Sequence, residues 1–204
     1  AVHIPFDKDA LRAGLSDLGM MNVPLSSRAE GRQTYLARPD LGRRLSEADA
    51  ARLKAMGSGP CDVAIVVADG LSSTAIKANA LPFMAAILPM LQKEGLTMGP
   101  VAVVENGRVA IGDEIGEILQ ARLMLMLIGE RPGLSSVDSL GAYITYAPRL
   151  GLTDADRNCI SNIREAGLKI PLAATKALWL IREALKRGLT GVDLKEEEGG
   201  HCKC

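Results

Sequence analysis

Histidine and aromatic residues are scarce in this chain of 204 residues, which limits the chemistry open to it. The two histidines, His3 and His201, lie near the two ends, so the body of the chain has no imidazole to act as a base. Nucleophilic sites of the Ser-His-Asp or Cys-His type need such a positioned base, and we therefore do not expect one. With aromatics at 3%, the core must consist of Leu, Ile, Val, Ala and Met.

The chain also lacks an excess of charge of either sign and any long apolar run. Lys plus Arg and Asp plus Glu number 24 each, so the formal net charge is zero. Proteins that bind nucleic acid usually show a basic excess. No stretch approaches the roughly 18 uninterrupted apolar residues of a membrane span. We therefore expect neither a nucleic-acid nor a membrane partner, and a near-zero charge favours association with other proteins.

The four cysteines, Cys61, Cys159, Cys202 and Cys204, are too scattered for a disulfide framework, which indicates a reducing cytoplasm. The first residues lack the basic start and apolar centre of a signal peptide. Neither common phosphate-binding loop, GxGxxG or GxxxxGK[ST], is present. The closing "HCKC" could chelate a soft metal, but a solvated terminus is the simpler interpretation.

Helical patterns dominate the start of the chain. Residues 7–21 have apolar positions at helical spacing, and residues 46–56 form a clearer helix. Ser46 is a suitable N-cap for it, and Asp49 stands where the acid of a capping box would be. We therefore expect residues 1–60 to be a helical N-terminal segment.

Apolar strands alternate with helices through the rest of the chain. We expect, in order, a strand at 63–68, a helix at 73–94 kinked or divided by Pro82 and Pro89, a strand at 101–104, a turn at 105–107, a short strand, a helix up to Gln120, strands at 122–128 and 141–148, and a helix at 170–188. Such alternation predicts an α/β fold with a parallel, doubly wound sheet. It covers residues 61–195, and a flexible tail is expected at 196–204.

Two of these strands end in sharp polar loops, "ADG" at 68–70 and "GERPG" at 129–133. The carboxyl ends of parallel strands meet at one edge of a sheet, where ligands bind. Asp69, Arg131 and Ser135 are candidate contacts from their loop positions alone.

Sharp loops without acid-base machinery favour a protein that holds part of a cofactor over a complete enzyme. An alternative from another class stays open, a self-sufficient nucleotide- or phosphosugar-binding α/β enzyme. Its "ADGLSS" and "GERPGLSS" loops would each lay backbone N–H groups on a phosphate at a helix start. Affinity for a small molecule without any protein partner would distinguish this alternative.

Five motifs in order resemble the small (light) subunit of ethanolamine ammonia-lyase. They are "RPDLGRRL" at 38–45, "ADGLSSTAIKAN" at 68–79, "GRVAIGDEIGEILQAR" at 107–122, "IGERPGLSSVDSLGAYITYAPR" at 128–149 and "DRNCISNI" at 156–163. The resemblance runs from about Tyr35 to about Lys195. The first 34 and the last nine residues do not carry it.

The resemblance implies an adenosylcobalamin-dependent enzyme that converts ethanolamine to acetaldehyde and ammonia by a radical mechanism. It implies a Rossmann-like, cobalamin-contacting domain at 61–195 that forms one wall of the cofactor site. A large TIM-barrel subunit would carry the substrate site, and lyase activity would need both subunits. The resemblance further implies a hetero-oligomer in the bacterial cytoplasm, linked to a bacterial microcompartment.

Three cobalamin contacts are implied by the motifs, Val109 in "GRV", Glu130 in "IGERPG" and Cys159 in "DRNCISN". Each has an ordinary alternative. Val109 is otherwise a core residue, Cys159 a small buried hydrophobe, and Glu130 an ion-pair partner of Arg131 or another arginine. No catalytic residue of this chain is implied.

A histidine ligand to cobalt is not expected from this chain. It has no DxHxxG loop, and His3 and His201 lie far from any strand end, without a partner to fix the ring. We therefore expect base-on binding, in which the coenzyme's own dimethylbenzimidazole is the lower ligand of cobalt, and no metal site in this chain.

Overall fold

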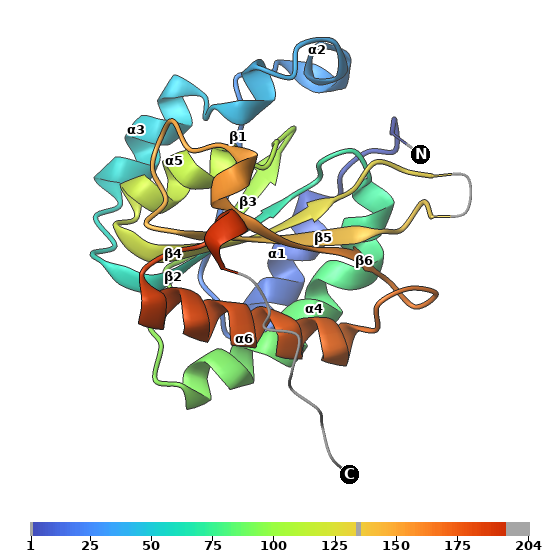
Figure 1. Ribbon diagram of the computed structural model, residues 1–204. Coiled ribbons are helices and arrows are strands. Elements are labelled where there is room, and N and C mark those ends of the chain that lie inside the picture. The colour runs from blue at the N-terminus through green and yellow to red at the C-terminus, as the bar shows by residue number, and fades with distance from the viewer. Residues whose placement is uncertain (1, 134–135, 195–204) are drawn as a thin grey trace.

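The structure is a computed structural model that describes residues 2–133 and 136–194. One six-stranded open sheet has helices on both faces (Figure 1), which confirms the predicted α/β class. The strands are β1 (Asn22–Ser26), β2 (Cys61–Ala68), β3 (Val101–Glu105), β4 (Ala121–Gly129), β5 (Leu140–Tyr146) and β6 (Asn158–Ile163). The α-helices are α1 (Lys8–Asp17), α2 (Gly31–Ala37), α3 (Glu47–Ala55), α4 (Ser73–Lys93), α5 (Ile111–Ile118) and α6 (Ile170–Arg187).

The strand order is β1-β3-β2-β4-β5-β6, and the sheet is mixed. The first four strands are parallel, whereas β5 is antiparallel to β4 and β6 is antiparallel to β5. The prediction of a wholly parallel sheet was therefore wrong for β5 and β6. Parallel strands need a crossover of about a dozen residues or more, usually a helix, and residues 130–139 between β4 and β5 are too few. The Rossmann-like character implied by the resemblance stays a prediction.

The N-terminal segment contributes a strand as well as helices. The helices expected at 7–21 and 46–56 are present as α1 and α3, but β1 between them was missed. β1 has five residues, contains Pro24 and pairs with β3 at the edge of the sheet. Proline cannot donate to a strand partner and is confined to such edges, so its sequence carries a weak strand signal. The division of the chain at residue 60 stays a prediction, and the tail at 196–204 lies outside the described residues.

Ser46 caps α3 as predicted, and its Oγ accepts from Asp49 N at 3.2 Å. The capping-box role of Asp49 was wrong, because its carboxylate accepts from Ser26 N at 2.7 Å and so fastens α3 to the end of β1. At the other end of the chain, α6 stops at Gly188 as predicted. Gly188 is left-handed, with φ 70°, and its N–H donates to Ala184 O at 2.8 Å.

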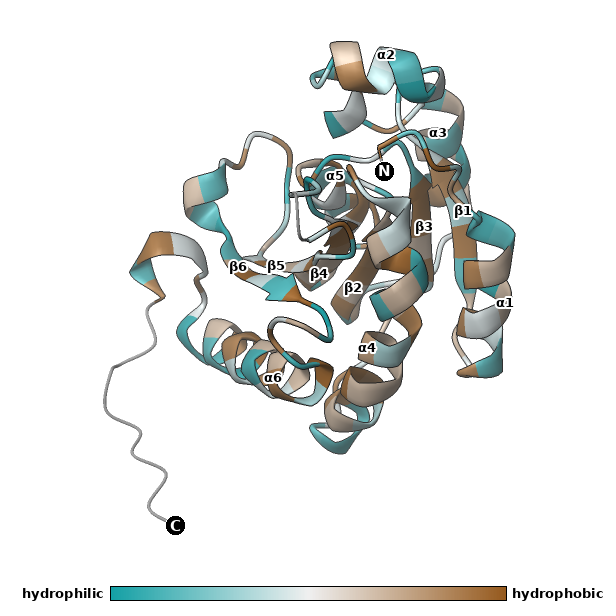
Figure 2. Ribbon diagram, turned by 90° about the vertical axis from the view of Figure 1, so that its right-hand side faces the viewer, coloured by the Kyte–Doolittle hydropathy of each residue, from teal (hydrophilic) through white to brown (hydrophobic). Residues whose placement is uncertain are grey.

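Two apolar clusters lie on the two faces of the sheet. Helices α1, α4 and α6 cover one face, and α3 and α5 cover the other (Figure 1). Side chains of β2 alternate between the clusters, with Val63 and Ile65 on one face and Ala64 and Val66 on the other. Figure 2 shows these central strands as apolar along their length. Such uninterrupted apolar strands result from burial on both faces.

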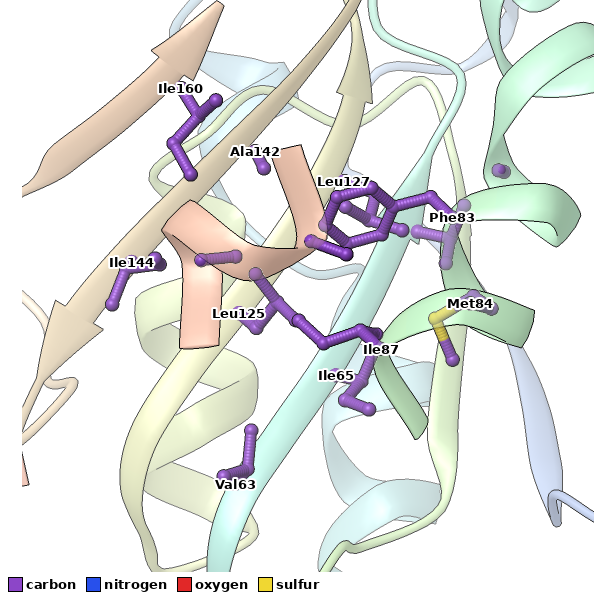
Figure 3. Close-up of a cluster of buried hydrophobic side chains, with 14 of the residues drawn as sticks. Val63, Ile65, Phe83, Met84, Ile87, Leu125, Leu127, Ala142, Ile144 and Ile160 are labelled. Carbon is purple, nitrogen blue, oxygen red and sulfur yellow. The ribbon is translucent and has the colours of Figure 1, made fainter. Parts of the chain in front are cut away.

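We predicted that Pro82 and Pro89 kink or divide this helix, and the division was wrong, because α4 is one continuous helix. Pro82 and Pro89 are both exposed and lie seven residues apart on the outer face, where water can hydrate the carbonyls that lose a partner. By length and composition α4 could cross a membrane, but its apolar side packs on the sheet. Figure 3 shows Phe83, Met84 and Ile87 of α4 against side chains of β2, β4 and β5.

Candidate functional site at the carboxyl edge of the sheet

The loops after β2 and β4 lie side by side, as their sequences predicted. Strand β3 lies on one side of β2 and β4 on the other, so the order of the chain reverses here, at the kind of point where α/β proteins bind ligands. Leu71 N donates to Gly129 O at 2.9 Å. A Cβ on Gly70, where φ is +55°, would lie 2.3 Å from Gly129 O, and one on Gly129 would lie 2.1 Å from Ser72 O. Only glycines permit this approach.

Helix α2 covers the loops after β2 and β3. Tyr35 is fully buried, and its hydroxyl donates to Gly107 O at 3.0 Å. Arg32 donates to Asp69 Oδ2 at 3.1 Å and to Gly70 O at 2.8 Å. Neither α2 residue was predicted from the sequence, although Tyr35 is one of only three tyrosines.

Asp69, a candidate contact by sequence, is buried beneath the loops. Its Oδ1 accepts from Gly107 N at 3.3 Å, opposite the Arg32 ion pair. Burial raises the pKa of Asp69 to about 7, although the charge of Arg32 opposes the shift. Asp69 therefore joins α2 to the loops and does not face a ligand directly.

A hollow of about 460 Å³ opens beside these loops, and we call it the edge hollow. It is lined by Tyr35, Gly70, Leu71, Arg108, Val109, Ile128, Gly129, Glu130, Arg131, Tyr143 and Ser161. Three residues singled out by sequence, Val109, Glu130 and Arg131, are thus together. Ser135 lies outside the described residues.

Cys159 lines a separate hollow of about 330 Å³ on β6, together with Lys176 and Leu180. Ser161 lines both hollows, so the two are neighbours. Cys159 is an exposed residue, which makes the interpretation as a buried hydrophobe wrong. On the adjacent strand Tyr143 pairs in register with Cys159. Burial raises the pKa of Tyr143, and Cys159 raises it further.

Glu130 is held by three neutral donors. Its carboxylate accepts from Ser139 Oγ at 2.5 Å, Ser161 Oγ at 2.6 Å and Asn162 N at 3.1 Å. Among the described residues, no arginine forms an ion pair with Glu130, and these three donors account for its position. A carboxylate has about four acceptor positions, and these three bonds occupy three of them. Ser139 and Ser161 were not predicted as site residues, and only their place inside the last two motifs could have indicated them.

Val109 is half-buried and packs against the α3–α5 side of the core while it lines the edge hollow, so the core interpretation holds only in part. Four residues later, Asp113 in the first turn of α5 forms a buried ion pair with Arg157. Burial raises the pKa of Asp113 to about 6 against the charge of Arg157. Since Arg157 directly precedes β6, this pair fixes the segment with Val109 relative to the strand with Cys159.

Within residues 2–133 and 136–194 no group of three or more His, Cys, Asp or Glu side chains could hold a metal ion. His3 is exposed, and His201 and the "HCKC" tail lie outside the described residues.

Comparison with known proteins covers almost the whole chain. The family model "Ethanolamine ammonia-lyase light chain (EutC)" matches residues 1–195. The ethanolamine ammonia-lyase small subunit of Azotobacter vinelandii (strain DJ / ATCC BAA-1303) is 56% identical over 97% of this chain and 74% of its own length. That of Pseudomonas aeruginosa (strain LESB58) is 54% identical over 97% and 73%, and that of Pseudomonas putida (strain W619) is 52% identical over 98% and 75%. The similarity includes the first 34 residues, so their expected exclusion was wrong.

Proposed function

The chain belongs to the ethanolamine ammonia-lyase light-chain family, and we propose that it forms one wall of an adenosylcobalamin site completed by a large subunit. The observation that supports this most is that Val109 and Glu130, two residues implied as cobalamin contacts, line one hollow. Ser161 joins that hollow to the one with Cys159, the third implied contact. When bound, the coenzyme supplies radical chemistry by homolysis of its cobalt–carbon bond.

The edge hollow fits the chemistry of a cobalamin, an apolar macrocycle surrounded by amide groups. Leu71, Val109 and Ile128 offer apolar surface, and Glu130 has an open acceptor position for an amide N–H. Arg108 also lines this hollow, and the outer N–H groups of its guanidinium can donate to an amide or phosphate oxygen of the ligand.

In the proposed complex, the residues of this chain bind and position the coenzyme. Ser139 and Asn162 N already hold the Glu130 carboxylate, which would accept a hydrogen bond from an amide N–H of the coenzyme, so little side-chain freedom is lost on binding. Val109 packs on apolar surface of the ligand and keeps water from it. We assign no general acid or base to the described residues of this chain, and we place the ethanolamine site in the large subunit.

The alternative of a self-sufficient phosphate-binding enzyme has less support. The N–H groups that would hold a phosphate at the start of α4 already donate within the chain. Leu71 N donates to Gly129 O, Ser72 N to Asp69 O and Ala75 N to Ser72 Oγ. The loop at 137–139 also covers this helix start, because Ser72 Oγ donates to Val137 O at 2.6 Å.

We place the coenzyme base-on, since His3 is exposed and does not line either hollow. Replacing His3 and His201 together by Ala should leave the affinity and the absorption spectrum of the bound coenzyme unchanged. A changed spectrum would assign the lower ligand to one of these histidines. We also place the complex in the bacterial cytoplasm, within a microcompartment.

The proposed function is tested by mixing. This chain alone should neither produce acetaldehyde from ethanolamine nor bind adenosylcobalamin tightly, and addition of the cognate large subunit should restore both. Equilibrium dialysis measures the binding, and an acetaldehyde assay measures the activity. Turnover by the chain alone would contradict the proposal. Tight binding of ATP or ribose 5-phosphate by the chain alone would support the alternative instead.

A further inference from the structure

Arg108 lines the edge hollow with a guanidinium group that is held in place but not fully satisfied. Its Cζ lies 4.4 Å from the centroid of the Tyr35 ring, and its Nη2 makes one long bond, 3.4 Å, to Tyr35 O. Its backbone N donates to Gly42 O at 2.7 Å, and a Cβ on Gly42 would lie 2.9 Å from Arg108 Cγ. Its Nε is buried without a partner among the described residues. The side chain is therefore positioned before any ligand arrives.

The charges around the edge hollow favour an anion. Arg32 also faces the Tyr35 ring, at 4.9 Å, but it is paired with Asp69. Among the residues that the structure describes, no ion pair involves Arg108, and Arg131 is a second, exposed guanidinium in the lining. The carboxylate of Glu130 also lines the hollow, but it accepts from Ser139, Ser161 and Asn162 N, and two guanidinium groups outnumber it there. Because Nε is buried, a ligand in the edge hollow would meet the outer N–H groups of the Arg108 guanidinium, whose charge no carboxylate neutralises among the described residues.

We propose that Arg108, assisted by Arg131 at the rim, binds the phosphate of the coenzyme's nucleotide loop. This rests on the proposed function. The phosphate is the single anionic group on a cobalamin whose other side chains are neutral amides. The planar guanidinium donates through a fork of N–H groups that matches phosphate oxygens, and it is weakly hydrated and stacks well on an aromatic ring. The stacking on Tyr35 leaves the edge of the guanidinium for the phosphate.

The experiment uses two corrinoids that differ by the phosphate alone, adenosylcobinamide and adenosylcobinamide phosphate. Both are titrated by absorption and by dialysis into the complex of this chain with its large subunit. The unaltered complex should bind the phosphate-bearing corrinoid more tightly. Arg108→Gln should weaken that binding on the order of ten- to a hundred-fold, as expected for loss of a charge-assisted hydrogen bond, and should leave adenosylcobinamide nearly unchanged.

Three further variants sharpen the result. Arg108→Lys keeps the charge but loses the fork, and should keep part of the phosphate preference. Arg131→Gln removes an exposed side chain, so folding is not at risk, and should reduce the preference by a smaller factor. Arg122→Gln is the matched control, because Arg122 is an exposed arginine at the opposite end of β4 paired with Asp62. It should keep the full preference.

Each result decides between stated alternatives. Equal weakening of both corrinoids by Arg108→Gln would overturn the proposal, since Arg108 would then bind an amide or only support the loop. The Arg108→Gln subunit could fail to assemble with the large subunit. In that case, the proposal is overturned if Arg108→Lys and Arg131→Gln both keep the full preference for the phosphate-bearing corrinoid. The chain alone, without the large subunit, should not bind ATP through Arg108. ATP binding that is lost in Arg108→Gln would assign the subsite to a nucleotide and would also overturn the proposal. Failure of the unaltered complex to bind adenosylcobalamin would instead reject the proposed function.

Discussion

Strand β2 has an aspartate at each end, and their surroundings differ sharply. Asp62, near its start, accepts from Thr97 N at 2.8 Å, Thr97 Oγ1 at 2.9 Å and Arg122 at 2.9 Å. The backbone N–H of Thr97 contributes most to lowering the pKa of Asp62 below its usual value. Asp69, just past the other end, is buried, and burial raises its pKa to about 7 despite Arg32.

The amino edge of the sheet is therefore a structural edge, and the carboxyl edge is the proposed binding edge. At the amino edge, charged groups lie near water and each bond favours the folded state. At the carboxyl edge, Asp69 is buried, Arg108 Nε has no partner among the described residues, and Gly70 and Gly129 allow backbones to touch. Such an arrangement costs stability, and clusters of this kind mark functional sites in proteins.

The largest expected difference between the two edges is steric. Gly129→Ala at the carboxyl edge places a Cβ 2.1 Å from Ser72 O, a backbone atom that cannot yield alone. We expect a loss of about 3 kcal/mol or more in the free energy of unfolding. Gly99→Ala at the amino edge meets first a side-chain atom, Cys61 Sγ, at 3.2 Å, and should cost about 1 kcal/mol. Urea unfolding measures both, and equal losses would remove the contrast.

The next difference concerns coenzyme binding. Glu130→Gln keeps the shape and removes the charge of an acceptor in the edge hollow, which should cost about 1.5–3 kcal/mol of binding free energy. The coenzyme Kd of the complex should rise on the order of ten- to a hundred-fold, with ethanolamine KM little changed. Glu94→Gln, at the far end of α4, is the control and should leave the Kd unchanged. An unaltered Kd for a folded Glu130→Gln complex would return Glu130 to a structural role.

The two aspartates should give slopes of opposite sign in stability against pH. The folded-state pKa of Asp69 is raised from 3.8 to about 7, so the folded state binds the extra proton and loses stability as pH rises through this window. Asp69→Asn should remove a slope of at most about 1.4 kcal/mol per pH unit. The lowered pKa of Asp62 gives stability that is present above pH 3.8 and lost as pH falls below it, and Asp62→Asn should remove that loss. Both slopes follow from the free energy of unfolding measured between pH 3 and 8 in steps of ~1 pH unit.

The smallest expected effect is at the amino edge itself. Arg122→Gln breaks a partly exposed ion pair with Asp62 at 2.9 Å, and such pairs contribute about 1 kcal/mol or less. The unfolding free energy should fall by no more than this, and less in high salt. A loss comparable to that of Gly129→Ala would show that the amino edge is as critical as the carboxyl edge.

Local pattern alone was enough for most helices and the central strands. The apolar runs in β2 and β4, the cap at Ser46 and the stop at Gly188 depend on neighbours in the chain, and each was predicted. The meeting of the two glycine-containing loops also followed, since parallel strands end at one edge. The family motifs, and not these patterns, indicated Val109, Glu130 and Cys159.

Only the tertiary structure decided the direction of β5 and β6, the place of β1, and the partners of the charged residues. Glu130 takes its donors from Ser139 and from residues 31 and 32 positions further on, and Arg32 meets Asp69 37 positions away. Local spacing in the sequence does not encode such pairs. A charged side chain forms hydrogen bonds with the groups that packing of the strands brings within about 3 Å of it. The sequence therefore indicates at which edge of the sheet the proposed site lies, whereas packing determines which side chains meet there.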